Sequence, residues 1–366
     1  MTRLKRRIVE LIGTVGPIPV SEYMALCLFD PEAGYYTTRE PFGAGGDFIT
    51  APEVSQMFGE LVAVWLYQTW QAAGAPMPVT LAEIGPGRGT LMKDMLRTLT
   101  RLDADFARSA SVALIETSPR LRDVQKATLA GVSDAVEWHE TVASLPETPL
   151  LIVGNELFDA IPIRQFVRTA DGWRERMVGL DANGELGFYA GAASLDPSLL
   201  PPDADTAPAG AIVEIAPARS ALMQTIAERI AEHGGAGLFF DYGHLQPGVG
   251  DTLQALRRHD HEDVLESPGE ADLTSHVDFA ALAVSTRAAG LHSDFTTQGA
   301  FLLSMGLLER AGSLGANADN TTRERLSGEV ERLAGPQAMG ELFKVLAIAH
   351  EDIVLPVFHS QVDQPE

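Results

Sequence analysis

The residues best suited to binding a ligand form one short segment, Leu81-Ala-Glu-Ile-Gly-Pro-Gly-Arg-Gly-Thr90, at an expected turn from a strand into a helix. Glycines at positions 85, 87 and 89 let the backbone turn tightly and approach a ligand, with the first amides of the helix behind it. A dinucleotide fingerprint requires G-x-G-x-x-G, and position 90 is Thr. The segment therefore predicts a ligand-binding turn of a different kind.

An acidic residue gives this turn its chemical preference. The spacing Glu83-x-Gly85-x-Gly87-x-Gly89 resembles motif I of the Rossmann-like S-adenosylmethionine-dependent methyltransferases. The Glu83 carboxylate suits a cationic amino-acid moiety, whereas it would repel a pyrophosphate. We predict that these four residues bind S-adenosylmethionine. The alternative is a structural strand-to-helix turn.

Two residues later in the chain are candidates for binding the ribose and the adenine of S-adenosylmethionine. Glu116 ends the next expected strand, in Ala113-Leu-Ile-Glu-Thr117, where such folds accept both ribose hydroxyls because two carboxylate oxygens match a vicinal diol. The alternative is an acid that stabilises a helix N-terminus. Trp138 follows a third strand and either borders the adenine or packs in the core.

Candidate acceptor-binding residues follow a fourth, buried strand in Gly154-Asn-Glu-Leu-Phe-Asp-Ala-Ile-Pro162. Polar groups at the carboxyl edge of a parallel sheet are placed to meet a substrate beside the cofactor. Carboxylates at Glu156 and Asp159, with Asn155, can hold a cationic nucleophile and take its proton. The alternative is that Asn155 and Asp159 cap turns.

These motifs lie on alternating strand and helix patterns, which predict an α/β fold with a mostly parallel, seven-stranded sheet flanked by helices. Between them, Ile163–Leu180 resembles one or two hairpins, Asp196–Gly210 a loop, and Tyr242–Ala271 a mobile lid or surface excursion. The predicted strands are Val79–Ile84, Val112–Ile115, Val136–Trp138, Leu150–Val153, Ile212–Ile215, Gly237–Phe240 and Phe343–Ala349; the predicted helices include Thr90–Thr100, Pro119–Ala130 and Pro217–Glu232.

The N-terminal residues 1–75 are predicted to be helical, interrupted by a glycine-rich loop at Phe42–Thr50. Thr50 and Glu53 form a capping-box pattern that predicts a helix start. We expect residues 1–75 to act as a lid, and residues 76–366 to form the main domain with insertions at about 163–210 and 242–275. The expected buried face of the capped helix comprises Val54, Met57, Phe58, Leu61, Val62, Trp65 and Leu66.

Composition narrows the class of protein. The 366 residues include 27 Lys and Arg against 50 Asp and Glu, a net charge of −23 that disfavours nucleic acid as a partner. The single cysteine, Cys27, excludes an internal disulfide and points to a reducing compartment. No segment predicts a signal peptide or a membrane span. We therefore expect a cytoplasmic protein without membrane insertion.

Taken together, these segments resemble the MidA family, whose mitochondrial members are complex I assembly methyltransferases that modify protein arginine. The resemblance implies a class I methyltransferase fold, S-adenosylmethionine as donor and a protein arginine as acceptor. It covers most of the chain. The matching segments are Gly46–Glu53, Glu83–Thr90, Gly154–Ala160, Asp241–Gly243, Asp272–Phe279 and Met339–Lys344.

The chemistry of that reaction assigns further roles. A sulfonium is already an activated electrophile, so we expect no metal, and catalysis is chiefly alignment. A guanidinium arrives charged, since its pKa exceeds about 12, and must be oriented by acceptors. We expect Glu156 and Asp159 to hold it, with Asp47 and Asp241 as further candidates. Asp47 is also a candidate for cofactor binding.

Other functions stay open at this point. A small-molecule methyltransferase keeps the enzyme class and changes the acceptor, because acceptor selection depends on loops without transferable motifs. A cofactor-binding assembly factor without turnover keeps only the fold and the ligand. A nicotinamide-dependent oxidoreductase is disfavoured by Thr90. Oligomeric state is not predicted.

Overall fold

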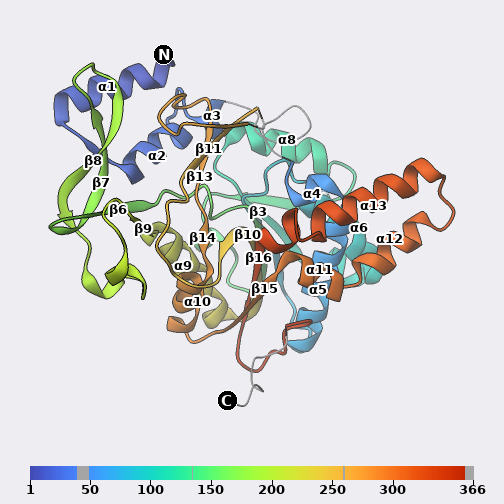
Figure 1. Cartoon of the computed structure of the whole chain (residues 1–366). Helices are drawn as coiled ribbons and strands as arrows, with labels where there is room; N and C mark the ends of the chain where they lie inside the picture. Colours follow the sequence, from blue (N-terminus) through green and yellow to red (C-terminus); the bar gives the residue numbers. More distant parts are fainter. Residues whose placement is uncertain (39–48, 134, 259, 359–366) are drawn as a thin grey trace. The chain divides into compact units, whose positions relative to one another are not determined.

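The computed structural model describes residues 1–38, 49–133, 135–258 and 260–358 (Figure 1). The chain forms two compact units. Unit 1 comprises Met1–Phe48, Phe158–Ala221 and Gln246–Asp278, and unit 2 comprises Ile49–Leu157, Leu222–Leu245 and Phe279–Glu366. This division differs from the expected boundary between residues 75 and 76. The glycine-rich loop and Asp47 lie outside the described residues, so the expected lid stays a prediction.

Unit 2 contains a mostly parallel sheet in which seven described strands follow the order β15-β16-β10-β5-β2-β3-β4. Among these seven strands, as far as the structure describes them, β16 pairs antiparallel with both β10 and β15, and the other pairs are parallel. This order and direction confirm the predicted fold class. The strands are β2 (Thr80–Ile84), β3 (Ser111–Ile115), β4 (Val136–His139), β5 (Leu150–Asn155), β10 (Gly235–His244), β15 (His292–Thr297) and β16 (Phe343–Ala349).

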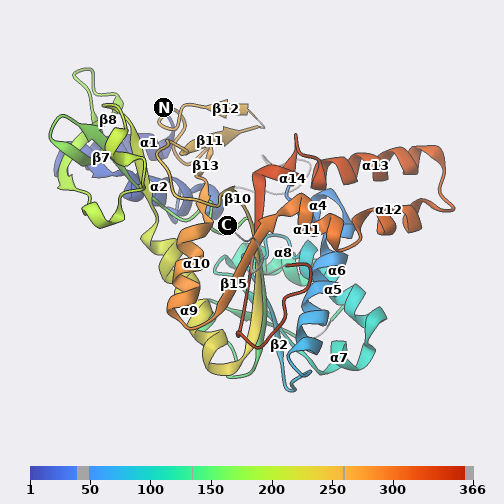
Figure 2. The ribbon, with the colours of Figure 1, turned by 60° about the horizontal axis from the view of Figure 1, so that its bottom comes forward.

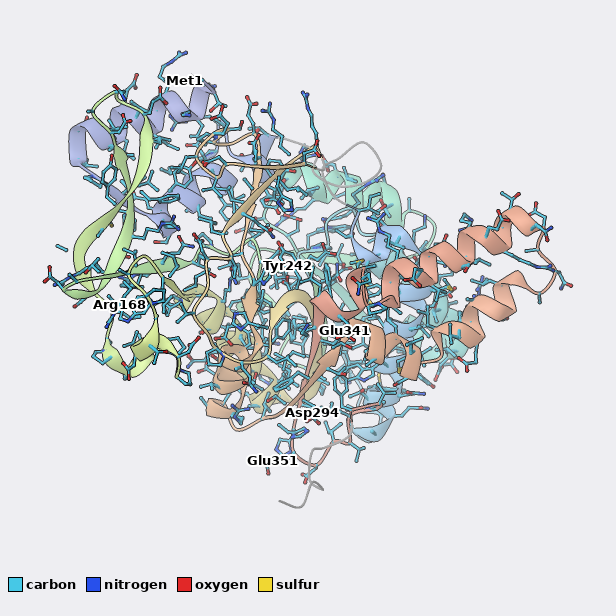
Figure 3. The ribbon with its side chains drawn as sticks, viewed as in Figure 1. Met1, Arg168, Tyr242, Asp294, Glu341 and Glu351 are labelled. Carbon is cyan, nitrogen blue, oxygen red and sulfur yellow. The ribbon has the colours of Figure 1, made fainter. Side chains whose placement is uncertain are left out.

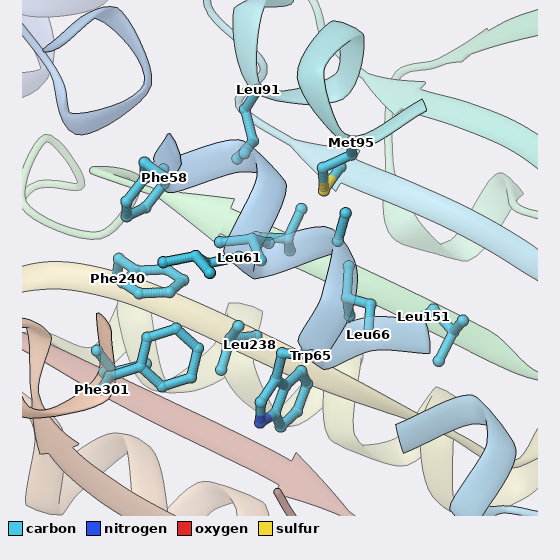
Figure 4. Close-up of a cluster of buried hydrophobic side chains, with 14 of the residues drawn as sticks. Phe58, Leu61, Trp65, Leu66, Leu91, Met95, Leu151, Leu238, Phe240 and Phe301 are labelled. Carbon is cyan, nitrogen blue, oxygen red and sulfur yellow. The ribbon is translucent and has the colours of Figure 1, made fainter. Parts of the chain in front are cut away.

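The central strands are buried on both faces, which explains their continuous apolar sequences. Helix α5 (Gln56–Ala72) and α6 (Thr90–Leu102) cover one face, and α10 (Phe279–Ala288) covers the other (Figure 2). Figure 4 shows the core under α5, where the Phe58 and Phe240 rings meet edge to face with centroids 4.9 Å apart. Burying such side chains is the main force that fixes the helices on the sheet.

The capped helix predicted to begin at Thr50 is interrupted. A short helix, α4 (Ala51–Val54), ends at Ser55, whose extended backbone starts α5 and whose hydroxyl accepts a bond from the Met57 amide. Neither half of the predicted capping box is seen: Thr50 makes no side-chain cap, and the Glu53 carboxylate accepts a hydrogen bond from the Thr90 hydroxyl. The predicted apolar face is otherwise buried, with Val54 only partly covered.

The other helices of unit 2 complete its layers. Helices α12 and α13 form an antiparallel hairpin (Figure 2). The remaining helical bounds are α7 (Ala104–Ser109), α8 (Pro119–Leu129), η1 (Val142–Ser144), α11 (Gln298–Ser304), α12 (Leu307–Gly315), α13 (Asn320–Ala334) and α14 (Met339–Leu342); α9 (Pro217–His233) has residues in both units.

Unit 1 is built around an antiparallel sheet in the order β1-β7-β6-β9, with β8 paired to β7. The prediction that Ile212–Ile215 resumes the parallel sheet is wrong, because this strand, β9, pairs antiparallel with β6. Arg168, labelled in Figure 3, lies over the Trp173 ring of the same sheet. The elements are α1 (Arg3–Val15), β1 (Ile18–Pro19), α2 (Val20–Phe29), α3 (Tyr35–Thr38), β6 (Arg164–Thr169), β7 (Gly172–Leu180), β8 (Leu186–Ser194), η2 (Pro197–Leu199), η3 (Ala204–Thr206) and β9.

The polar stretch expected as a mobile excursion, Tyr242–Ala271, contains regular structure. Strand β10 extends into its start, and a three-stranded antiparallel sheet follows, made by β11 (Gln254–Arg257), β12 (Asp260–Glu262) and β13 (Asp272–Thr274). Ala255 and Leu265 are buried in the core of unit 1 with α1 and α2. The segment is therefore more than a surface excursion, and its predicted role as a mobile lid stays a prediction. A short strand, β14 (Val277–Asp278), ends the unit.

None of the helices traced through the described ranges has both the length and the apolar character that crossing a bilayer demands.

Candidate functional site

The glycine turn joins β2 to α6 at the carboxyl edge of the parallel sheet. Gly85, Gly87 and Gly89 all have positive φ, at 66°, 51° and 81°, a region that side chains with a Cβ rarely adopt. A Cβ on Gly85 would lie 3.1 Å from Leu157 Cδ1, which follows β5. The turn lies where β2 has β3 on one side and β5 on the other, the switch point at which such sheets bind ligands.

Glu83, on β2, has a side chain that is buried next to this turn. Its side chain is 3% exposed, and one carboxylate oxygen, Oε2, has no hydrogen-bond partner among the described residues. Burial raises the pKa of Glu83 to about 8, opposed by a hydrogen bond from the Met92 amide in the first turn of α6. Glu83 thus caps a helix whose N-cap, Gly89, has no side chain to do so. Its Oε2 is a buried acceptor that no described residue satisfies.

Glu116 follows β3, level with Gly85 across the sheet. Its Oε1 accepts a hydrogen bond from the Ser118 amide at 2.7 Å, and its Oε2 accepts one from Gln125 Nε2 at 3.1 Å. Burial is the main cause that raises the pKa of this carboxylate. A carboxylate held from two sides in a fixed orientation is suited to accept both hydroxyls of a ribose.

Gln125, on α8, was not identified from the sequence. Its side chain connects the glycine turn, Glu116 and Trp138, since it bonds to the Gly87 carbonyl at 2.8 Å and to the Trp138 indole at 2.9 Å. Trp138 therefore directs its N–H to Gln125, and Lys126 Nζ lies 5.6 Å from the centroid of its ring. That Trp138 borders the adenine stays a prediction.

Asn155 ends β5 at the same edge, and Glu156 follows it. Glu156 adopts φ 52°, which is strained for a residue with a side chain. Its Oε1 accepts hydrogen bonds from Asn155 Nδ2 at 3.0 Å and from the Ala51 amide at 3.3 Å. The Oδ1 atom of Asn155 is buried without a hydrogen-bond partner among the described residues. The two residues therefore place polar groups beside the glycine turn.

Asp241, on β10, is fully buried, and its carboxylate accepts hydrogen bonds from the amides of Leu157 and Tyr242. It therefore holds the backbone that follows Glu156.

Asp159 belongs to unit 1, whereas the residues above belong to unit 2. Its side chain is buried and accepts a hydrogen bond from the Ala160 amide at 2.9 Å. Its carbonyl accepts one from the buried Arg219 guanidinium at 3.0 Å. Within unit 2, the structure thus places Glu83, the three glycines, Glu116, Asn155 and Glu156 at the carboxyl edge of the parallel sheet.

The chain is similar to known methyltransferases over most of its length. A family model described as S-adenosyl-L-methionine-dependent methyltransferase matches residues 61–297. The mitochondrial protein arginine methyltransferase NDUFAF7 of Danio rerio is 36% identical over 369 residues, covering 94% of this chain and 86% of its own length. The Homo sapiens protein of the same name is 34% identical over 374 residues, covering 95% and 83%.

Solved structures agree with this relationship. A Burkholderia thailandensis protein bound to S-adenosyl-homocysteine superimposes with a TM-score of 0.82 at 29% identity, covering 98% of this chain and 94% of that one. A native crystal structure of a Burkholderia thailandensis protein gives a TM-score of 0.81 at 30% identity, with the same coverage.

Proposed function

The chain belongs to the S-adenosyl-L-methionine-dependent methyltransferase family, and from this membership we propose that it methylates an arginine side chain of a protein substrate. The resemblance to methyltransferases noted from the sequence is confirmed at the level of family, fold and donor. The acceptor is our proposal, supported by relatives named as protein arginine methyltransferases.

The donor site fits S-adenosylmethionine on its own chemistry. The methionine ammonium is suited to the Glu83 oxygen that lacks a partner, and the ribose diol to the carboxylate of Glu116. The glycines that the positive φ values favour have no side chain, so the backbone of the turn can approach the ligand closely. When bound, the cofactor supplies a methyl group on a positively charged sulfur.

One observation carries the proposal for the acceptor: Glu156 is held at positive φ directly after β5, beside the glycine turn. A backbone strain of this kind persists only where surrounding contacts enforce it, and such positions concentrate at functional sites. An acceptor guanidinium presents five N–H donors and needs carboxylate and amide acceptors to orient it. Glu156 supplies a carboxylate for this purpose, and Asn155 an oxygen that accepts no hydrogen bond from the part of the chain that the structure describes.

Asp159 remains our second proposed carboxylate. Asp241 is a weaker candidate for contacting the guanidinium, since both of its oxygens accept bonds from backbone amides. As the guanidinium loses a proton during transfer, Glu156 or Asp159 is the proposed acceptor of that proton. From the family resemblance, we propose a subunit or assembly intermediate of respiratory complex I as the substrate.

The test is transfer of a labelled methyl group from S-adenosylmethionine to proteins in a lysate from a strain that lacks this gene. Wild type is compared with Glu156→Gln and Asp159→Asn. Glu147→Gln, an exposed glutamate in the same unit as Glu156, is the matched control. Affinity for S-adenosylhomocysteine is measured for each variant to separate donor binding from transfer.

We expect one or a few labelled proteins carrying methylarginine with wild type and the control. We expect loss of the label with either site variant while S-adenosylhomocysteine affinity is retained. Unchanged transfer by Asp159→Asn would remove Asp159 from the mechanism. Donor binding without any protein label would refute the arginine proposal and favour a small-molecule acceptor or an assembly factor.

A further inference from the structure

The side-chain amide of Gln125 has a hydrogen-bond partner for each of its polar groups. Gln125 is completely buried on α8. Its Nε2 donates to the Gly87 carbonyl at 2.8 Å and to Glu116 Oε2 at 3.1 Å, while its Oε1 accepts from Trp138 Nε1 at 2.9 Å. One side chain thus contacts two separate parts of the proposed donor site.

The chemistry of the partners fixes which way this amide faces. An indole N–H can only donate, so the Gln125 oxygen must face Trp138. A carbonyl and a carboxylate can only accept, so the NH₂ group must face Gly87 and Glu116. Both amide hydrogens and the amide oxygen are therefore used, and flipping the amide would break all three bonds. Neither a carboxylate nor an apolar side chain at this position can make the same set.

We infer that Gln125 is a positioning residue for donor binding: it holds Glu116 in the orientation that accepts the ribose and holds the glycine turn at Gly87. The inference rests on the proposed role of Glu116 and is independent of the acceptor. Glu116 also accepts hydrogen bonds from the backbone amides of Thr117 and Ser118, which directly follow it in the chain. Gln125 is the contact that holds the carboxylate from a different element, α8.

The close approach of α8 to the turn supports the same inference. A Cβ placed on Gly89 would lie 3.5 Å from Gln125 Cγ and 3.6 Å from its Cα, so α8 packs directly on the last glycine. The Gln125 amide reaches the carbonyl of Gly87, the middle glycine. Helix α8, the turn and Glu116 are thereby linked through one buried side chain.

Titration calorimetry with S-adenosylhomocysteine on the full-length protein tests this. Gln125→Met keeps the approximate volume and removes the amide, and Gln125→Glu keeps the shape and removes both donors. Gln298→Met is the matched control, because Gln298 is also completely buried in unit 2 and donates to the Leu333 carbonyl. Thermal unfolding without ligand records the loss of stability in each variant.

We expect both Gln125 variants to bind S-adenosylhomocysteine roughly ten- to a hundred-fold more weakly, the range for a hydrogen bond to a charged group. Gln298→Met loses stability but keeps wild-type affinity. Trp138→Phe, which leaves Gln125 in place but frees its amide to flip, weakens binding by a smaller factor. Wild-type affinity in both Gln125 variants would overturn the inference.

A second ligand distinguishes positioning from a general structural effect. The analogue of S-adenosylhomocysteine without the ribose 3′-hydroxyl binds wild type more weakly, since one contact with Glu116 is missing. If Gln125 acts through Glu116, the penalty for removing the hydroxyl is smaller in Gln125→Met than in wild type. Equal penalties in the two proteins would show that Gln125 does not act through Glu116.

The pH dependence of Gln125→Glu provides a further check. Two facing carboxylates repel one another, and protonation of one restores a donor. The ratio of wild-type to variant affinity for S-adenosylhomocysteine is therefore expected to decrease as the pH is lowered from 8 to 5.5. A ratio that does not change with pH would contradict the proposed contact with Glu116. Failure of protein arginine methylation leaves each of these binding results interpretable, so the two proposals can fail separately.

Discussion

The carboxylate of Glu53 accepts a hydrogen bond from the hydroxyl of Thr90, with the oxygens 2.5 Å apart and the two residues 37 positions apart in sequence. Arg88 lies 3.7 Å from the other Glu53 oxygen. Thr90 is the residue that separates this turn from a dinucleotide fingerprint, and its hydroxyl holds α4 against the start of α6. Since the Ala51 amide of α4 also bonds to Glu156, this short helix connects the turn to Glu156.

Thr90→Val should therefore weaken donor binding as well as the fold. The substitution keeps the branched shape and removes the hydroxyl, leaving the Glu53 carboxylate without that donor. We expect a loss of about 1–3 kcal/mol in the free energy of unfolding, because a hydrogen bond to a charged group is lost. We also expect weaker S-adenosylhomocysteine binding. Urea unfolding and calorimetry measure the two effects.

Thr98→Val is the matched control for this prediction. Thr98 lies on the same helix, and its hydroxyl donates to the Asp94 carbonyl one turn earlier. The control should change stability less and leave ligand affinity unaltered. Equal affinities of the two variants for S-adenosylhomocysteine would show that the Glu53 contact does not support the donor site.

Glu83 should make the ligand-free protein less stable as pH rises. Its pKa is raised from 4.5 to about 8 by burial, so the folded state keeps a proton that the unfolded state releases above pH 4.5. This contribution is fully present below pH 4.5 and is lost as pH rises through 8. Glu83→Gln cannot ionise, and its Tm relative to wild type should therefore increase between pH 5 and pH 8.5. A Tm difference that does not vary with pH would contradict the raised pKa.

The same pKa predicts how ligand affinity changes with pH. An ammonium group favours the ionised carboxylate, so at pH 6 binding must first remove the proton from Glu83. Affinity for S-adenosylhomocysteine should rise with pH by up to roughly tenfold per unit and level off above pH 8. Glu83→Gln should bind more weakly and lack this slope. Calorimetry in buffers of different ionisation enthalpy would detect the proton released by wild type and its absence in the variant.

The sequence was sufficient where local patterns determine structure. The strand bounds of β2, β3 and β16 differ from the predicted ones by at most one residue, because each is a short apolar run between clear turn signals. Strand β9 has the same kind of sequence, yet it joins a different sheet. A short apolar run specifies a buried strand without specifying its partner, and only tertiary pairing decides between sheets.

Donor-site residues within the glycine motif were predictable for a related reason, since their spacing is local. Gln125 was not, because its partners are 38, 9 and 13 residues away and a single glutamine on a helix carries no pattern. The capping box at Thr50 failed for a comparable reason. The Glu53 carboxylate bonds to the Thr90 hydroxyl, which is distant in sequence and which no local pattern predicts.

The positive φ of Glu156 is expected to lower the free energy of unfolding, and substitutions at this position test that. Both Glu156→Gly and Glu156→Ala remove the carboxylate and its contacts with Asn155 and the Ala51 amide. They differ in how well the new residue tolerates φ 52°, which glycine adopts freely and alanine adopts at a cost of about 1–2 kcal/mol. We expect the glycine variant to be more stable by this amount in urea unfolding, and both variants to lose methyl transfer. If alanine were as stable as glycine, position 156 would not be strained; if either variant kept full transfer, the Glu156 carboxylate would have no part in holding the acceptor.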